Sequence, residues 1–323
     1  MRLPKEFENV PCDKTRLKPG DEANFDAAVE FLKNERWRIP DAVVVKLASV
    51  GSFFRKTQNP HQPLEKGRNI ETVMRLIESG ISGVHFNATD ERGRRTGGAE
   101  AYHALIDPCR ERYGYSFVAD CNVLYGDTFA EQLAPVLEGL AETSPLGLQH
   151  PRQWVEAAAR VMEMNKCRPE LIGHNSGEIE LARRLLIGPG LVRKPYCWIL
   201  LIGAPSIATR LMEYMPNPRA MLETLLLMVN RIREIDENSF IIVCAAGRAS
   251  IYLTTAAMLL GLHVRIGTED TMWKYPHRDD MLKDNTEVFE QTRAISELLG
   301  RRVATGNEYR EFIGLEPKED VKS

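Results

Sequence analysis

Polar side chains that could do chemistry follow several short apolar runs in this sequence. His85 and Asn87 end one run, and Glu269 and Asp270 follow another, four and five residues after Arg265. Residues two apart in an extended strand point to the same side, so His85 and Asn87 share a side. Imidazole and carboxylate groups bind metals or transfer protons, and a guanidinium beside a carboxylate keeps it ionised. This set of residues predicts metal-assisted or acid–base chemistry on a small molecule.

Four further residues at the ends of apolar runs are candidates for substrate binding. Ser52 closes a turn of small residues whose backbone can approach a ligand closely, and Asn122 and His174 follow two later runs. Cys121 precedes Asn122, and for its thiol the two alternatives are a small buried residue and a nucleophile. The charged stretch 90–95 is predicted to be a solvated turn.

Elements that would bring these residues together recur along the chain from Asp41 onward. Short apolar runs rich in Val and Ile each precede a polar loop and a segment of helical period, which is the pattern of repeated βα units. The predicted strands are residues 42–47, 82–86, 116–121, 140–143, 170–173, 198–202, 240–244 and 262–266. The predicted helices are residues 70–79, 99–113, 128–140, 151–165, 179–188, 218–236 and 248–260.

Eight continuous apolar runs favour a parallel sheet covered on its outside, so the predicted fold is an eight-stranded βα (TIM) barrel. Its chemistry is expected at the carboxyl ends of the strands. A doubly wound open sheet is the alternative, but no G-x-G-x-x-G motif follows the first strand.

The chain length of 323 residues fits either two ordinary domains or one barrel with an extension. Residues 1–40 contain four prolines and one helical pattern, at 24–37, and are predicted to be an N-terminal extension. Residues 41–323 are predicted to form the catalytic barrel.

The composition narrows the class of ligand. The chain has 42 Lys and Arg against 45 Asp and Glu, a net charge of −3, which argues against binding to nucleic acid or to a membrane surface. Six cysteines stand without C-x-x-C spacing, so neither a zinc ribbon nor a disulfide framework is expected. The N-terminus lacks the apolar run of a signal peptide, and we expect a cytoplasmic protein with a small ligand.

Three blocks of these residues also match a known family. Residues 261–270 read G-L-H-V-R-I-G-T-E-D and look like a block G-x-H-x-R-x-G-x-E-D. Residues 80–87 are similar to a block that contains H-x-H, and Asn285 with residues 304–310 is similar to the closing elements of the same family. On these residues the sequence resembles the β-keto acid cleavage enzyme family from about residue 42 to residue 315.

The resemblance implies a zinc-dependent exchange of the retro-Claisen type. A β-keto acid and the cosubstrate acetyl-CoA would become a new acyl-CoA and acetoacetate. Carried over position by position, it makes His85 and Glu269 metal ligands, Asp270 the base and Arg265 the partner that orients Asp270. Family members form homo-oligomers, so a dimer or tetramer is expected.

The sequence departs from the family pattern at four positions. Asn87 stands where the family has its second histidine, Phe53 where it has a glutamate, Cys121 where a serine contacts substrate, and Thr271 where asparagine is usual. An amide is a poorer zinc ligand than imidazole, so three alternatives remain. Zinc is retained by His85, Glu269 and Asn87 or His174 with water; a weaker or different cation binds; or the site holds no metal.

Phe53 in place of a carboxylate favours a keto acid without an ammonium group. Because of Asn87 and Phe53, a degenerate barrel that binds a metabolite or partner without cleaving it is the alternative function. A barrel aldolase or epimerase with a phosphate site has less support, since the loops at 245–250 and 267–273 hold few glycines.

Overall fold

The computed structural model describes residues 4–11, 29–30, 33, 38–51, 59–89, 95–203 and 217–319. Contacts within the chain divide it into two units, Met1–Ile39 and Pro40–Ser323. In the first unit the described residues include one short 3-10 helix, η1 (Lys5–Phe7). Of the predicted helix at 24–37 only Val29, Glu30 and Lys33 are described, so this prediction lies largely outside the described residues. The assignment of residues 1–40 to an extension stays a prediction.

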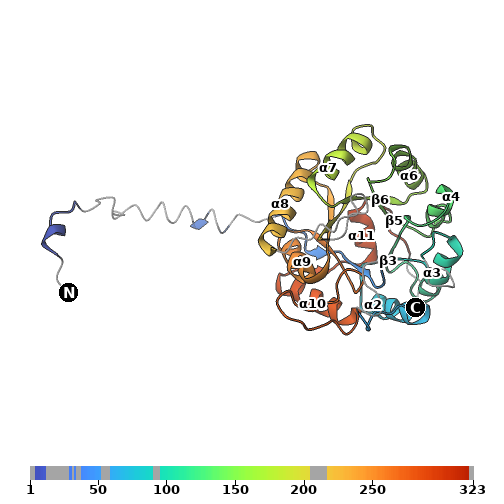
Figure 1. The fold of residues 1–323 in the computed structure, drawn as a ribbon, viewed down its shortest axis with the longest axis horizontal. Helices are drawn as coiled ribbons and strands as arrows, with labels where there is room; N and C mark the ends of the chain where they lie inside the picture. Colours follow the sequence, from blue (N-terminus) through green and yellow to red (C-terminus); the bar gives the residue numbers. More distant parts are fainter. Residues whose placement is uncertain are drawn as a thin grey trace. The chain divides into compact units, whose positions relative to one another are not determined.

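The second unit is a closed barrel of eight parallel strands, which confirms the predicted barrel over the open sheet (Figure 1). Hydrogen bonds between β9 and β2 close the ring. The strands are β2 (Val45–Ala48), β3 (Gly83–Phe86), β4 (Val118–Cys121), β5 (Thr143–Leu146), β6 (Arg168–Gly173), β7 (Cys197–Ile202), β8 (Phe240–Ala245) and β9 (His263–Ile266). Each corresponds to a predicted strand, but β5 begins where the predicted 140–143 ends, because Leu140 still belongs to the turn after the preceding helix.

Both faces of the barrel strands are buried, which explains their unbroken apolar character. Val45 and Leu47 belong to the larger hydrophobic cluster, which includes residues of the surrounding helices. Val44, Ile172 and Ile199 belong to a smaller cluster inside the barrel. The inner cluster fills one part of the barrel, and the rest of the interior is polar, as described below.

Helices surround the strands as a ring (Figure 1). They are α2 (Lys66–Glu78), α3 (Ala99–Tyr113), α4 (Phe129–Gln132), α5 (Ala134–Leu137), α6 (Arg152–Met164), α7 (Ser176–Ala182) with the π-helix η2 (Arg183–Ile187), α8 (Pro218–Ile235), η3 (Gly247–Ala249), α9 (Ser250–Leu259) and α10 (Asn285–Leu298). The predicted helix 128–140 is two short helices, since Pro135 at the start of α5 has no N–H with which to continue α4. None of the described helices is long and apolar enough to cross a membrane.

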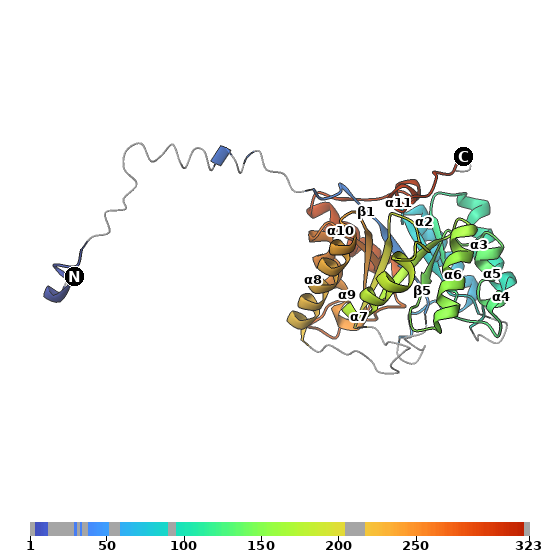
Figure 2. The same cartoon turned by 90° about the horizontal axis from the view of Figure 1, so that it is seen from above.

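The last helix, α11 (Gly306–Phe312), closes one end of the barrel. It lies at the centre of the ring in Figure 1 and at one end in Figure 2, near the small parallel pair β1 (Ala42–Val43) and β10 (Arg302–Val303). Thr305 and Glu308 form a capping box at its start, and Tyr309 reaches into the barrel to donate to Glu170 (2.9 Å). The chemistry is therefore expected at the other end, where the strands have their carboxyl ends.

Candidate active site

Arg265 holds both predicted carboxylates at the carboxyl end of β9. Its Nε donates to Asp270 Oδ2 (3.0 Å) and its Nη2 to Asp270 Oδ1 (2.7 Å), a two-point pair. The same Nη2 lies 3.2 Å from Glu269 Oε1. Burial alone would lower the pKa of Arg265, but the charges of Asp270 and Glu269 outweigh it and raise that pKa well above its usual value. The structure thus brings together three of the predicted site residues as one buried ionic group.

A tight turn after β9 sets the positions of the two carboxylates. Gly267 has φ +139°, and a Cβ there would stand 2.0 Å from the carbonyl oxygen of Ala48, so only glycine fits. The next contact is a backbone bond from Glu269 N to Ala48 O (3.1 Å). Gly51 also has to be glycine, because its Cβ would lie 1.7 Å from Glu269 Cγ. The small-residue turn after β2 therefore serves to seat the Glu269 side chain.

Asn285, one of the residues that carry the family resemblance, stabilises this turn through hydrogen bonds to Thr268. Its side-chain oxygen accepts from Thr268 N (2.8 Å), and its amide donates to Thr268 Oγ1 (3.0 Å). Thr268 Oγ1 in turn donates to Ser49 O (2.7 Å). These bonds tie the start of α10 to the ends of β2 and β9.

His85 on β3 is fixed by a buried charged chain that the sequence analysis missed. Its Nδ1 lies 2.8 Å from Asp120 Oδ2, which also accepts from Lys46 Nζ (2.8 Å), and Lys46 bonds on to Glu170. Burial would raise the pKa of Asp120, but Lys46 and His85 hold it well below its ordinary value. Because Nδ1 of His85 is bonded to Asp120, Nε2 is the nitrogen that faces away from the charged side chains of Asp120, Lys46 and Glu170. It has no hydrogen-bond partner among the described residues.

The sequence did contain an indication of this group of buried charged side chains. Lys46 and Asp120 are each a lone charged residue inside an apolar strand run, and Glu170 begins another run. Charged residues rarely enter such runs unless they are paired. Both faces of a barrel strand are buried, so residues at equivalent positions on different strands had to meet in the interior.

Asn87, directly after the end of β3, lies against Glu269. Its Nδ2 donates to Glu269 Oε2 (2.9 Å) and to the carbonyl of Val50 (3.0 Å), and its Oδ1 accepts from Asn122 Nδ2 (3.0 Å). Burial raises the pKa of Glu269, opposed by the charges of Arg265 and His85. Asn122 and Asn87 thus join the cluster around Glu269.

Two other predicted substrate residues lie outside this cluster, and Ser52 is not among the described residues. Cys121 points to the helical side of β4, since its neighbours Asp120 and Asn122 point inward, and it belongs to the outer hydrophobic cluster. Burial raises the pKa of Cys121 well above its usual value, so the thiol stays protonated and a nucleophilic role is disfavoured. His174 follows β6 and is paired with Glu178 through Nδ1 (2.9 Å).

Arg95 is a further candidate for the site. The sequence predicted that it belongs to a solvated turn, of which residues 90–94 lie outside the described residues. Thr89 and Arg95 form an antiparallel bridge beyond β3, and the Arg95 guanidinium lies 5.3 Å from the centroid of the Tyr125 ring. Its Nη1 is buried without a hydrogen-bond partner in the described parts of the chain. Its charge acts on Glu269, where it lowers the pKa against the effect of burial. A half-buried cation with a buried N–H group that has no partner among the described residues is suited to an anionic substrate.

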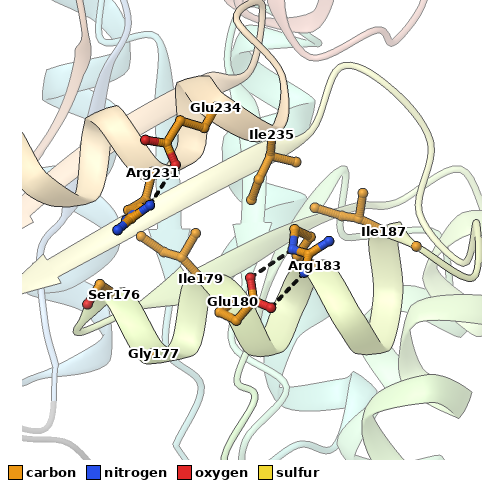
Figure 3. A pocket seen from close by; sticks show the side chains of 10 residues that line it. Ser176, Gly177, Ile179, Glu180, Arg183, Ile187, Arg231, Glu234 and Ile235 are labelled. Atoms are coloured by element: carbon orange, nitrogen blue, oxygen red, sulfur yellow. Dashed lines mark hydrogen bonds and ion pairs between the residues drawn. The ribbon is translucent and has the colours of Figure 1, made fainter.

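A large pocket in the described part of the chain lies elsewhere. A groove of about 750 Å³ runs along the outside of the barrel between α7, η2 and α8. Figure 3 shows its polar side chains paired with one another, Glu180 with Arg183 (2.7 Å) and Arg231 with Glu234 (2.8 Å). The described residues that line it include none of the predicted site residues, so its size alone does not make it the place of the chemistry.

Comparison with known proteins decides the family. The family model described as beta-keto acid cleavage enzyme matches residues 42–315. The chain belongs to this family. The resemblance noted in the sequence is therefore confirmed, over the same residues.

Two curated relatives are both named 3-keto-5-aminohexanoate cleavage enzyme. The chain is 23% identical over 291 residues to the 3-keto-5-aminohexanoate cleavage enzyme of Fusobacterium nucleatum, covering 85% of this chain and 98% of the relative. It is 23% identical over 286 residues to the enzyme of the same name from Acetoanaerobium sticklandii, covering 85% and 99%.

Solved structures share the fold. A ternary complex of ObcA with a C4-CoA adduct and oxalate has a TM-score of 0.66 at 17% identity, covering 80% of this chain and 68% of that chain. A type I 3-dehydroquinate dehydratase from Clostridium difficile has a TM-score of 0.53 at 10% identity, covering 81% and 93%. At these identities the likeness concerns the barrel alone.

The zinc site expected for a β-keto acid cleavage enzyme does not fit the residues found here. Zinc takes three or four strong ligands from His, Cys, Asp and Glu. Within the described parts of the chain no three such side chains are grouped to hold a metal. His85 and Glu269 are two donors, and Asn87 turns its N–H group, not its oxygen, toward Glu269.

Proposed function

We propose that this protein cleaves a β-keto acid with acetyl-CoA as cosubstrate, giving a new acyl-CoA and acetoacetate. Family membership and the names of the curated relatives support β-keto acid cleavage, and the CoA adduct bound by ObcA supports a CoA thioester as the second substrate. The observation that carries the proposal is the buried two-point pair of Arg265 and Asp270, beside Glu269, at the carboxyl end of the barrel.

Asp270 is the proposed base. The carbon between the keto and carboxylate groups of a β-keto acid is its most acidic C–H, and Asp270 takes that proton. Arg265 orients Asp270 through two hydrogen bonds, and its Nη1, which has no hydrogen bond to a described residue, is available to the enolate oxygen. The carbanion then attacks the thioester carbonyl of acetyl-CoA, a carbon–carbon bond forms, and CoA leaves as the thiolate.

Cleavage reverses these steps on the other carbonyl. The thiolate adds to the original keto carbon, the bond between that carbon and the former carbanion carbon breaks, and the new acyl-CoA is released. The electron pair stays on the acetoacetate carbanion, which recovers the proton from Asp270. No proton or electron is gained or lost overall, so the exchange needs no further reactant.

Arg95 is the proposed anchor for the carboxylate of the keto acid. Its Nη1, buried and without a partner among the described residues, provides the charge-assisted donor that a carboxylate requires, and its charge is felt at Glu269. In this proposal the substrate's carboxylate lies toward Arg95 and its reactive carbon toward Asp270.

The side chain of the keto acid is proposed to be uncharged, on the evidence of Phe53 in the sequence, a residue that lies outside the described ones. A panel of β-keto acids with acetyl-CoA, analysed for acyl-CoA products by mass spectrometry, tests this. The expected best substrate has no ammonium group, and a best substrate that bears one would refute the preference. Absence of turnover with every member of the panel would favour the non-cleaving barrel. A homo-oligomer and a cytoplasmic location also stay predictions.

A further inference from the structure

We infer that the carboxamide of Asn87 takes the place beside Glu269 that the family resemblance gives to a metal-bound imidazole, so that this site binds no zinc tightly. The inference rests on the proposed function only for the location of the active site. The inference itself concerns which groups contact the Glu269 carboxylate and which of them balance its negative charge.

The orientation of Asn87 is fixed by its neighbours. Its Nδ2 donates to two acceptors, Glu269 Oε2 and the carbonyl of Val50, while its Oδ1 accepts from the Asn122 amide. Turning the amide over would set Oδ1 against both acceptors and set Nδ2 against the N–H of Asn122. The oxygen that could bind a cation is therefore directed away from Glu269.

Glu269 already has a donor on each oxygen. Asn87 donates to Oε2, and the Arg265 guanidinium lies 3.2 Å from Oε1. A divalent cation bound at Glu269 would stand close to this guanidinium, and two like charges a few ångströms apart in a buried site repel strongly. Beside Glu269, where the family resemblance implies a zinc ion, this protein has N–H groups that contact the carboxylate.

Among the residues that the structure describes, the remaining donors are too few. His85 offers one nitrogen, Nε2, because Nδ1 is bound to Asp120. His174 likewise keeps only its Nε2, since Nδ1 pairs with Glu178, and within the described parts of the chain it is not grouped with His85 and Glu269 as a third metal ligand. One imidazole and one carboxylate fall short of the three protein ligands of a catalytic zinc site. In the proposed reaction the enolate charge is then balanced by Arg265 and by amide N–H groups.

Zinc binding to the full-length chain, measured apart from activity, tests the inference. After dialysis against chelator, we expect well under about 0.1 zinc per chain by elemental analysis, and no binding in competition with a micromolar zinc indicator. Asn87→His should bind about one zinc per chain, roughly 100-fold more tightly than the original protein. The double variant Asn87→His with His85→Ala is the matched control and should lose that gain.

One tightly bound zinc in the original protein would overturn the inference. So would an Asn87→His variant that unfolds like the original protein on heating yet gains no zinc affinity. If that variant fails to fold, the titration of the original protein still decides. Turnover of a β-keto acid that survives chelation supports the inference, and turnover that returns only with stoichiometric zinc contradicts it. If no β-keto acid is turned over with or without zinc, the proposed function fails while the zinc titration still stands.

Discussion

At the scale of the residue, the candidate active site differs from its surroundings in which charged side chains have partners. Arg265 serves two carboxylates, Asp270 through two bonds and Glu269 through one longer contact. Asn87 supplies the second donor to Glu269. Every charge of this group is paired, whereas the Nη1 of nearby Arg95 is buried without a partner among the described residues. That contrast is why we assign the substrate's carboxylate to Arg95.

Replacing Arg95 by Met should raise KM for the keto acid about 10- to 100-fold while kcat changes little, because a charge-assisted bond to the substrate is lost in the ground state and transition state alike. Steady-state kinetics at saturating acetyl-CoA measure this. Arg112→Met is the matched control, since Arg112 also lies over a tyrosine ring (5.4 Å) but on the surface of α3. An unchanged KM in the Arg95 variant would remove Arg95 from the substrate site.

The sequence led to Arg265, Glu269 and Asp270 because they stand close together after one strand. It did not reveal the charged chain of Lys46, because Asp120 and Glu170 lie 74 and 124 positions further along and meet Lys46 only when the barrel closes. It left two alternatives for Cys121, and the structure agrees with the small buried residue, because Asp120 and Asn122 face inward and Cys121 faces the helices. Contacts between distant strands and the facing of single residues need the folded barrel.

At the scale of the element, α11 closes the barrel instead of serving the site. Its Arg310 is fully buried and donates to Glu142 through Nε (2.7 Å) and Nη2 (3.0 Å), and to the carbonyl of Phe117 (2.8 Å). Burial would raise the pKa of Glu142, but Arg310 and Arg110 lower it to about 2. Residues 304–310, which match closing elements of the family, therefore contribute to the stability of the barrel. In the sequence alone they look like part of a functional motif.

Arg310→Met should lower the free energy of unfolding by about 3 kcal/mol or more, because it leaves a buried carboxylate and two backbone carbonyls short of their donor. Urea unfolding followed by circular dichroism gives the value. Arg302→Met breaks the exposed pair between Arg302 and Glu308 and should cost less than about 1 kcal/mol. Equal losses in the two variants would contradict the role given to α11.

Elements with strong local signals were predicted well. The bounds of α3 (Ala99–Tyr113) match the prediction, and α6 and α8 differ from it by one residue at one or both ends. The region 128–140 was predicted as one helix because its apolar spacing continues through Pro135, which in fact starts α5. The helices α10 and α11 were not predicted, because their residues were interpreted through the family resemblance and not for their helical period.

At the scale of the whole molecule, the barrel has a chemical end and a structural end. His263 lies deep at the structural end, stacked on Phe240 at 4.4 Å, with Nδ1 accepting from Val44 N (3.0 Å). Burial lowers the pKa of His263 from 6.5 to about 3, helped by the charges of Arg301 and Arg233. The folded protein therefore keeps this imidazole neutral over the pH range in which the unfolded chain would protonate it.

This shift makes stability depend on pH. Since the folded-state pKa lies below the unfolded value, the contribution of His263 is fully present above about pH 6.5 and is lost as the pH falls toward 3. Between pH 7.5 and pH 5 the loss is about 2 kcal/mol. The variant His263→Asn keeps an acceptor near the δ position but has no group that titrates there, so this part of the pH dependence should disappear.

Urea unfolding at the two pH values measures the change for the original protein, His263→Asn and the control His103→Asn. His103 is partly exposed on α3 beside Asp107, so its variant controls for the loss of a histidine from the surface. The same pH dependence in His263→Asn as in the original protein would show that His263 is not the group responsible.

The central claim is that the acetyl group of acetyl-CoA is transferred to the carbon released from the keto acid. Acetyl-CoA labelled with carbon-13 at the carbonyl, mixed with the best β-keto acid of the panel, tests this directly by nuclear magnetic resonance. We predict label at the keto carbon of acetoacetate, an unlabelled new acyl-CoA, and loss of both products with Asp270→Asn. Label in free acetate, or acetoacetate formed equally well by Asp270→Asn, would contradict the account.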